Sequence, residues 1–483
     1  MNLSPQDPNL ALANTPFEAL SVGQSATVAR LCTANDLIVF AHASGNMNPI
    51  HLPSTDTDGD GKDDAPIAPS MWLASLISSV LGNSLPGPGS LYLAQTLTFS
   101  GRARVGDTLS IKVTVAALDD DHTVTLVTRV SGPDGVVLVE GEAKVKAPIE
   151  PVYLKDIEVP ELQVQKHRHF DAMLELAQTL DPLNVAVVAP DDPNSLGGAL
   201  LARDEGLILP ILVGSKTRIE KAASDLGASI DGLELIDIED EPASAARAVA
   251  MVHEGRVAAI MKGHMHTDGL LKHVVKSDGG LRTGKRISHV FVMDVPGRPQ
   301  PIIITDAAIN ITPDLKTKVD IVQNAINIAL SIGIKVPKVG ILSAVETVNP
   351  AIPSTIDAAV LSKMADRGQI TGGIVDGPLA MDNAVDVGAA RTKGIGGLVA
   401  GHANVLVAPN LEAGNMLAKE LTFLAHAEAA GLLVGASVPV ILTSRADDDK
   451  ARLASCALAV LYDVWLRTGK PVKADLFKGN AEQ

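Results

Sequence analysis

Apolar and polar residues alternate with a period of two along TLSIKVTVAALDDDHTVTLVTRVSGPDGVVLVEGEAKVKA, residues 108–147. Such alternation is typical of strands with one buried face, and the breaks LDDDH and GPDG are typical of turns. Ahead of these strands, PSMWLASLISSVLG carries apolar residues at helical spacing and ends at Gly82. The pattern predicts an α+β domain in which one long helix packs on a curved antiparallel sheet.

The pattern changes in the second part of the chain. Short unbroken apolar runs end in small or turn residues, and helical segments separate them; the runs are NVAVVAP, LPILVGS, VAAIMKG, KVGILSA, ANVLVAPN and VPVILTS. Runs of this kind are typical of parallel strands that are covered by helices on both faces. We therefore expect an α/β region built around a parallel sheet in three layers, with ligands at the carboxyl ends of its strands.

The two patterns are separated by a proline-rich stretch with little periodicity. We expect a first domain over 1–148, a linker over 149–165 and an α/β domain over 166–483. The α/β domain is expected to have two lobes. Lobe 1 covers about 166–300 plus 440–478, and lobe 2 covers about 301–439.

Composition narrows the possible functions of the 483 residues. The net charge is −16, which argues against binding to a nucleic acid through a general positive field. No apolar run approaches the ~18 residues that a membrane helix needs, and two distant cysteines fit a reducing compartment. The usual glycine-rich motifs of dinucleotide and nucleotide sites do not occur. We expect a cytoplasmic protein without a membrane segment.

The second part of the chain resembles the phosphate acetyltransferase and phosphate butyryltransferase family. The resemblance is carried, in order, by MKGHMHTDGLLKHVVK, SHVFVMD, PIIITDAAINITPDL, VGILSAVETVNP, IVDGPLAMDNAV, ANVLVAPNLEAGNMLAKEL and VILTSRADDD. It implies transfer of an acyl group between coenzyme A and phosphate, with both as substrates, no bound cofactor and no metal. It also implies an active site between two α/β lobes, and we expect a homo-oligomer.

The resemblance assigns roles to individual residues of this site. Ser444 would donate a hydrogen bond to the transition state, and Arg445 would bind phosphate or the acyl carbonyl. The base matches the family less well, and Asp448 is the expected candidate. The expected substrate-binding residues are His266, Thr267, Lys272, Arg282, Asn310, Gly414 and Asn415. Two alternatives stay open for parts of this set, namely helix capping by Ser444 and a metal pair formed by His264 and His266.

The first part of the chain resembles the MaoC-like hydratases, which have the hot-dog fold. The resemblance rests on FEALSVGQSATVARLCTANDLIVFAHASGNMNPIH, LTFSGRARVGDTLSIKVTV and VLVEGEAKVKAP. In that family an Asp and a His activate the water that adds to an enoyl-CoA. These positions correspond to Asn46 and His51 here, and an amide cannot serve as the acid or base. The loop Asp56 to Asp64 is partly similar to a calcium loop but lacks its last carboxylate, since Ile67 stands there.

These patterns predict a phosphate acyltransferase fused to a hot-dog domain that binds acyl-CoA and has weak or lost hydratase activity. One alternative is a bifunctional enoyl-CoA hydratase and phosphate acetyltransferase with both sites active. The other is a non-catalytic acyl-CoA-binding regulatory protein. Retention of Ser444 and Arg445 argues against the second alternative, and Asn46 argues against the first.

Overall fold

A computed structural model describes residues 12–52, 65–154, 167–442 and 449–477. The chain divides into one unit over residues 1–164 and another over 165–483. Each unit is described by itself below.

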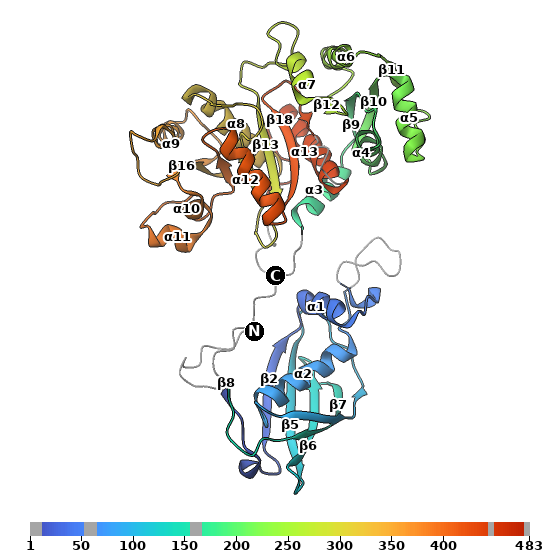
Figure 1. Cartoon of the computed structure of the whole chain (residues 1–483), viewed down its shortest axis with the longest axis vertical. Helices are drawn as coiled ribbons and strands as arrows, with labels where there is room; N and C mark the ends of the chain where they lie inside the picture. Colours follow the sequence, from blue (N-terminus) through green and yellow to red (C-terminus); the bar gives the residue numbers. More distant parts are fainter. Residues whose placement is uncertain (1–11, 53–64, 155–166, 443–448, 478–483) are drawn as a thin grey trace. The chain divides into compact units, whose positions relative to one another are not determined.

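In the first unit, helix α2 (Ser70–Asn83) packs on an antiparallel sheet, as Figure 1 shows. The sheet has the order β2-β5-β6-β7-β3, and β4 also pairs with β7. Leu109, Ile111 and Val113 of β5 point into the core, while the residues between them are exposed. This helix on a curved antiparallel sheet is the α+β hot-dog arrangement. The strands are β2 (Ser25–Leu31), β3 (Leu91–Gln95), β4 (Thr98–Phe99), β5 (Thr108–Leu118), β6 (Thr123–Ser131) and β7 (Val137–Lys146).

Shorter elements complete this unit. Helix α1 (Ala34–Ser44) begins with a capping box between Thr33 and Asp36, and it ends at Gly45 in the left-handed conformation. The other short elements are η1 (Phe17–Ala19) and η2 (Pro49–His51). Strand β1 (Leu12–Ala13) pairs with β8 (Tyr153–Leu154). The first part of the expected linker is therefore paired with the start of the described chain.

In the second unit, the described strands form one eleven-stranded sheet with the order β11-β10-β9-β12-β19-β18-β13-β14-β17-β15-β16. The strands are β9 (Leu183–Val188), β10 (Ile208–Gly214), β11 (Leu235–Asp237), β12 (Ala259–Lys262), β13 (Ser288–Asp294), β14 (Ile302–Thr305), β15 (Lys338–Leu342), β16 (Ile374–Leu379), β17 (Val405–Val407), β18 (Glu428–Val434) and β19 (Val440–Ile441).

The sheet is mixed, which corrects the expectation of a parallel sheet. Strands β11, β10, β9, β12 and β19 are mutually parallel, as are β14, β17, β15 and β16. Between the two sets, β18 and β13 pair antiparallel with each other and with their outer neighbours. The reason is the short connections over 295–301 and 435–439, which allow only a reversal of direction. A buried strand shows the same apolar run in either direction, so the sequence could not reveal this.

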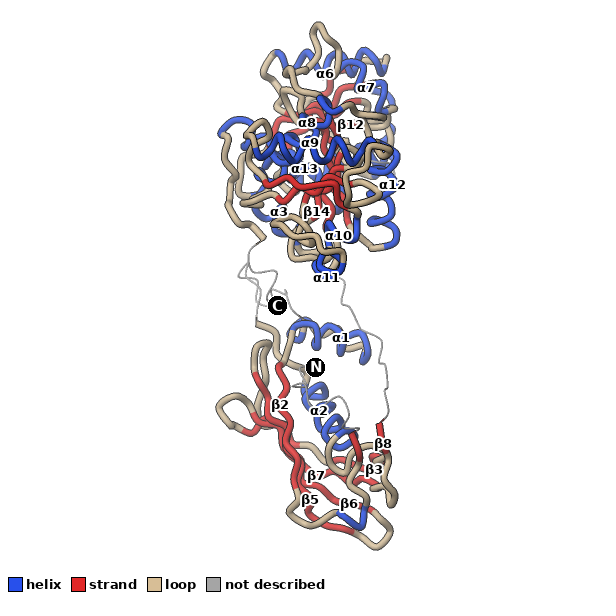
Figure 2. The backbone as a smooth tube through the Cα atoms, turned by 90° about the vertical axis from the view of Figure 1, so that its left-hand side faces the viewer, coloured by secondary structure: helices blue, strands red, loops and turns tan. Residues whose placement is uncertain are grey.

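Helices cover both faces of this sheet (Figure 2). On one face lie α3 (His169–Gln178), α4 (Pro193–Asp204), α5 (Lys216–Leu226), α8 (Leu315–Ser331), α9 (Pro353–Asp366) and α13 (Asp449–Thr468). On the other lie α6 (Glu241–His253) and α7 (Thr267–Val274) over the first parallel set. The same face carries α10 (Met381–Val385), α11 (Val387–Thr392) and α12 (Leu411–Leu424) over the second set.

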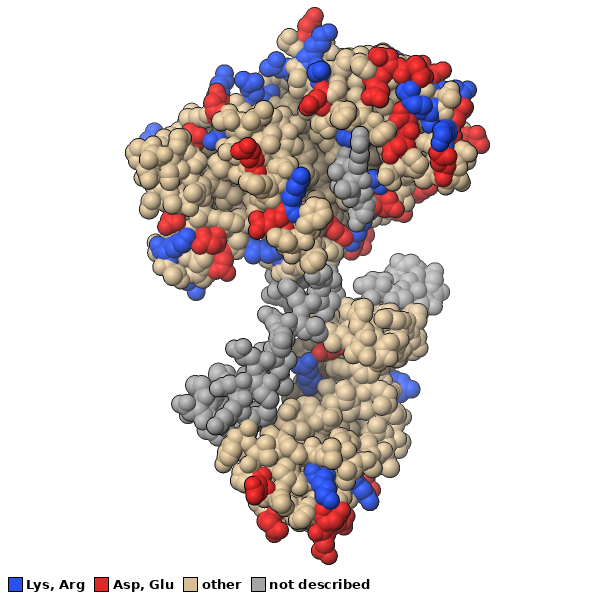
Figure 3. Space-filling view, viewed as in Figure 1, with Lys and Arg blue, Asp and Glu red and all other residues tan. Residues whose placement is uncertain are grey.

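Acidic and basic side chains are interspersed over the face of the second unit that Figure 3 shows. Among the described helices, none combines the length and the apolar character that crossing a membrane requires.

Candidate active site

The carboxyl ends of β9, β12 and β19 lie side by side. Met261 of β12 is level with Val187 of β9 on one side and with Ile441 of β19 on the other. The loops that follow these three strands therefore leave the sheet at the same edge, where ligands of α/β sheets bind. The predicted catalytic residues Ser444, Arg445 and Asp448 follow β19, but they lie outside the described residues.

The loop between β12 and α7 is held against the end of β9 by backbone contacts. The amide of Gly263 donates to the carbonyl of Val188 at 2.8 Å, and the amide of His264 donates to that of Ala189 at 2.7 Å. A Cβ atom at Gly263 would lie 2.3 Å from the Ala189 carbonyl oxygen, so only glycine fits there. The buried ammonium of Lys262 donates to the Gly263 carbonyl at 3.1 Å. The glycine at position 263 and these hydrogen bonds therefore fix the position of the loop.

His264, the first histidine of HMH, contacts an acidic residue of a neighbouring loop. Its Nδ1 atom lies 3.2 Å from Oδ1 of Asp191, in the loop after β9. The other oxygen of Asp191 accepts a 2.8 Å hydrogen bond from Nε of Arg218, which also contacts Glu239. The bond to Asp191 raises the pKa of Arg218, and the Glu239 charge adds to this. Asp191 was not predicted, because it is far from His264 in sequence.

Three predicted substrate-binding residues follow on α7. His266 is the N-cap residue of this helix, Thr267 is its first residue, and Lys272 lies in its last turn. His266 and Lys272 are exposed, and Thr267 is half-buried. Because the N-terminus of a helix carries partial positive charge, this end of α7 favours an anion.

A second group of predicted residues surrounds the turn after β14. Buried Asp306 accepts hydrogen bonds from the backbone amides of Ala308, Ile309 and Asn310 at 3.0 to 3.1 Å, and from Nδ2 of Asn310 at 2.5 Å. Nδ2 of Asn415 donates to the carbonyl of Ala307 at 3.1 Å.

Gly414 and Arg282 have different relations to this turn. Gly414 of α12 lies so near it that an added Cβ would be 2.4 Å from the carbonyl oxygen of Asp306. Asn310, Gly414 and Asn415 therefore belong to one group. Arg282 forms a backbone bridge with Ala436, beside the connection between β18 and β19, and joins neither group through a described contact.

The two groups flank the centre of the sheet on one face. Helix α7 packs over the first parallel set, and α12 contacts β13 and β14 on the same face. Between them, Phe291, Ala429 and Leu442 face this side and are only half-buried. This partly open strip is the candidate floor of the active site.

His289 is a buried residue of this region that sequence analysis missed. It is 2% exposed, and its ring contacts Phe291 with 4.4 Å between centroids. Burial lowers its pKa to about 4, an effect that the charge of Asp306 partly opposes. Its Nδ1 atom is buried without a hydrogen-bond partner among the described residues. A histidine inside the apolar run SHVFVMD was the available signal.

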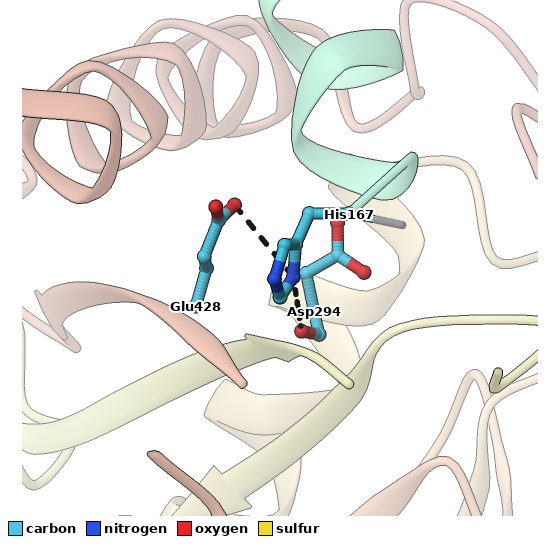
Figure 4. Close-up of side chains that lie close together, drawn as sticks. All are labelled: His167, Asp294 and Glu428. Atoms are coloured by element: carbon cyan, nitrogen blue, oxygen red, sulfur yellow. Dashed lines mark hydrogen bonds and ion pairs between the residues drawn. The ribbon is translucent and has the colours of Figure 1, made fainter. Parts of the chain in front are cut away.

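A further cluster lies where α3 meets the ends of β13 and β18. Nδ1 of His167 lies 3.2 Å from the carbonyl oxygen of Asp294 and 3.9 Å from a carboxylate oxygen of Glu428 (Figure 4). The three side chains are close enough to hold a metal ion. Their contacts nevertheless give them structural partners. The Asp294 carboxylate accepts from the amides of His169 and Phe170 at the start of α3. Lys450 lies 3.3 Å from Glu428.

A cavity of about 920 Å³ lies elsewhere in this unit. It opens at the amino ends of β14, β15 and β17 and is lined in part by Arg298, Lys338 and His402. No predicted site residue in the described part of the chain lines it. A smaller cavity lies along α9.

In the first unit, Asn46 and His51 lie on the segment that follows α1. The Oδ1 atom of Asn46 accepts from the amide of Asn48 at 3.2 Å, so the amide serves as a local turn contact. Nδ1 of His51 lies 2.7 Å from the carbonyl oxygen of Ile67. A carbonyl can only accept, so this contact makes Nδ1 the protonated nitrogen and leaves Nε2 as the basic one. The calcium-like loop Asp56 to Asp64 lies outside the described residues.

Comparison with known proteins identifies the family of the second unit. Residues 243–460 match the family described as Phosphate acetyl/butaryl transferase. A phosphate acetyltransferase of Rhizobium meliloti is 57% identical over 293 residues, which cover 61% of this chain and 93% of that protein. A branched-chain phosphotransacylase from Enterococcus faecalis V583 shares 30% identity with a TM-score of 0.51, over 58% of this chain and 99% of that one.

The R-hydratase PhaJ1 from Pseudomonas aeruginosa shares 34% identity, over 32% of this chain and 99% of that one, with a TM-score of 0.30. Through its C-terminal unit, this chain belongs to the phosphate acetyl/butyryl transferase family.

Proposed function

We propose that the second unit transfers an acyl group between coenzyme A and inorganic phosphate. The observation that carries this proposal is the family membership of residues 243–460, combined with the adjacent carboxyl ends of β12 and β19. In the direction of acyl phosphate formation, a phosphate oxygen attacks the thioester carbonyl. The bond from carbon to sulfur breaks, and coenzyme A leaves as a thiolate that takes up a proton.

The chemistry requires a donor for the developing oxyanion, cations for phosphate and a group that exchanges the proton of the thiol. Ser444 is proposed as the donor, Arg445 as the cation and Asp448 as the thiol's proton partner. His266, Thr267 and Lys272 would bind phosphate beside the N-terminus of α7. Arg282 is proposed to assist Lys272 in binding phosphate, and Asn310, Gly414 and Asn415 are proposed to contact the substrates in the cleft. This assignment needs neither a metal nor a bound cofactor.

The 57% identity to a phosphate acetyltransferase supports acetyl-CoA as the acyl donor, with butyryl-CoA as the second candidate. The test is thiol release from each thioester with and without phosphate. We expect phosphate-dependent release from at least one of them. Equal release without phosphate would indicate a thioesterase and contradict the proposal.

For the first unit we propose acyl-CoA binding with little or no hydratase activity. His51 has a free basic nitrogen among its described contacts, but Asn46 offers no carboxylate. The bifunctional alternative requires a substitute carboxylate for Asn46. Equilibrium binding of crotonyl-CoA and its rate of hydration, measured on the same sample, distinguish the two.

For the whole protein we propose a location in the cytoplasm and assembly into a homo-oligomer.

A further inference from the structure

We propose that His264 is a catalytic residue of the acyl transfer, which exchanges a proton with the phosphate substrate while Asp191 positions its ring. This inference rests on the function proposed above and extends it to a residue pair that the resemblance did not supply. It starts from the 3.2 Å contact between Nδ1 of His264 and Oδ1 of Asp191.

The contact defines which ring nitrogen can react. A carboxylate only accepts hydrogen bonds, so it holds the proton on Nδ1 and leaves Nε2 as the basic atom. Asp191 is 5% exposed, whereas the side chain of His264 is 42% exposed. Nε2 has no partner among the described residues, so it is accessible to a ligand. A buried carboxylate behind an accessible imidazole is the arrangement that orients a histidine for proton transfer.

The two loops that carry the pair are rigidly joined. His264 and Gly263 donate their backbone amides to Ala189 and Val188. Ala189, two residues before Asp191, has a φ of +50°, a conformation that is unfavourable for a residue with a side chain. Arg218 holds the second oxygen of Asp191 at 2.8 Å. Side chains fixed in this way lose little freedom when a substrate binds.

The surroundings favour phosphate as the partner. His264 lies between the buried ammonium of Lys262 and His266, the N-cap residue of α7. Across the sheet edge, β12 runs parallel to β19, and the proposed Ser444 and Arg445 follow that strand. A phosphate beside His264 would therefore lie near the N-terminus of α7, where the partial positive charge favours an anion.

The proposed step conserves atoms and charge. A hydrogen phosphate dianion attacks the thioester carbonyl through one oxygen, the bond from carbon to sulfur breaks, and the thiolate leaves with the electron pair. Nε2 of His264 takes the remaining proton of the phosphate, so that the acyl phosphate leaves as a dianion. The thiolate takes up a proton from the carboxyl group of Asp448 or from water. In reverse, the imidazolium returns its proton to the departing phosphate.

The competing explanation is a surface ion-pair network of Asp191, Arg218 and Glu239 that His264 merely touches. If the contact is only structural, its removal changes stability but affects no chemical step. Kinetics distinguish the two, because only a proton-transfer role changes kcat and its pH dependence.

The experiment measures acyl phosphate formation by the full chain, with His264→Gln, Asp191→Asn, the double variant and His253→Gln as the control histidine of the same unit. We expect His264→Gln to lower kcat about 10²-fold, with KM for the acyl-CoA thioester within about threefold. The rate should lose its rise with pH on the acidic side, and added imidazole should restore part of it. The double variant should be no slower than His264→Gln, because Asp191 acts through the ring.

Retention of kcat within about threefold in His264→Gln, with an unchanged pH profile, would overturn the inference. Additive losses in the double variant would overturn the positioning role of Asp191. Absence of acyl transfer by the unmodified protein would contradict the proposed function instead, so the two failures are distinguishable. Circular dichroism and the melting temperature show whether each variant is folded.

Discussion

The Nζ atom of Lys450 lies 3.3 Å from a carboxylate oxygen of Glu428, which ties the first turn of α13 to the start of β18. The same ammonium lies 3.2 Å from Asp171 of α3. These contacts therefore hold the start of α13, which begins at Asp449. Burial raises the pKa of Glu428, while Lys450 and His167 act in the opposite direction.

Lys450→Met should therefore destabilise the protein in a pH-dependent way. The raised pKa of Glu428 means that its protonated form is favoured in the fold, so the variant resembles the parent at low pH. As pH rises through that pKa, the ionised carboxylate loses its partner. Lys450 is 40% exposed, so we expect a loss of only about 1–2 kcal/mol at pH 8.

Thermal unfolding at pH 5 and pH 8 measures this effect. Lys221→Met is the matched control, since Lys221 pairs with Asp225 on the surface. The control should lower stability by less than about 0.5 kcal/mol at either pH. An equal loss at both pH values for Lys450→Met would show that the pair with Glu428 does not matter.

Gly414→Ala should destabilise the protein although alanine is the better helix former. The new methyl group would lie 2.4 Å from the carbonyl oxygen of Asp306, so the helix or the turn after β14 must move. We expect a loss of about 1–3 kcal/mol in the free energy of unfolding and a lower kcat. Gly396→Ala is the control, because no atom lies within 4 Å of its added Cβ. A stabilised Gly414→Ala variant would mean that the close approach is relieved at no cost.

The adjacent carboxylates Asp448 and Asp449 should differ in their contribution to catalysis. Asp449 is 75% exposed and lies 3.4 Å from Arg452, which gives it a local role at the start of α13. Asp449→Asn should therefore keep kcat within a few-fold, whereas Asp448→Asn should lower it by about 10²-fold as a lost acid or base does. The steady-state rate of thiol release compares the two. Similar small effects would remove Asp448 from the proposed mechanism.

Asn46→Asp should increase hydration of crotonyl-CoA by the full chain at least about tenfold, since it restores one member of an acid/base pair. The measurement is the loss of enoyl absorbance with and without the substitution, and His51→Gln in the same background should abolish the gain. If the unmodified protein already hydrates crotonyl-CoA rapidly, a carboxylate other than residue 46 serves the site.

The strand pattern of the first unit and the division into two units followed from the sequence, because alternation and apolar runs directly report burial. The direction of β13 and β18 did not, since a run buried on both faces looks the same in either direction. Asn310, Gly414 and Asn415 were predicted as substrate-binding residues, but the turn at Asp306 that all three contact was not predicted. Asp306 accepts four hydrogen bonds within the turn and a fifth from the amide of His289 in β13, and these are visible only in the folded chain. Asp191 was missed because it lies 73 residues from His264 in sequence.

The most direct test of the central claim is the rate of thiol release from acetyl-CoA and butyryl-CoA, with and without phosphate, by the unmodified protein and by Arg445→Ala. The account predicts phosphate-dependent release by the unmodified protein and a loss of about 10²–10³ in kcat in the variant, as for a lost charge contact to the transition state. Phosphate-dependent release at a similar rate in both, or no release from either thioester by the unmodified protein, would contradict it.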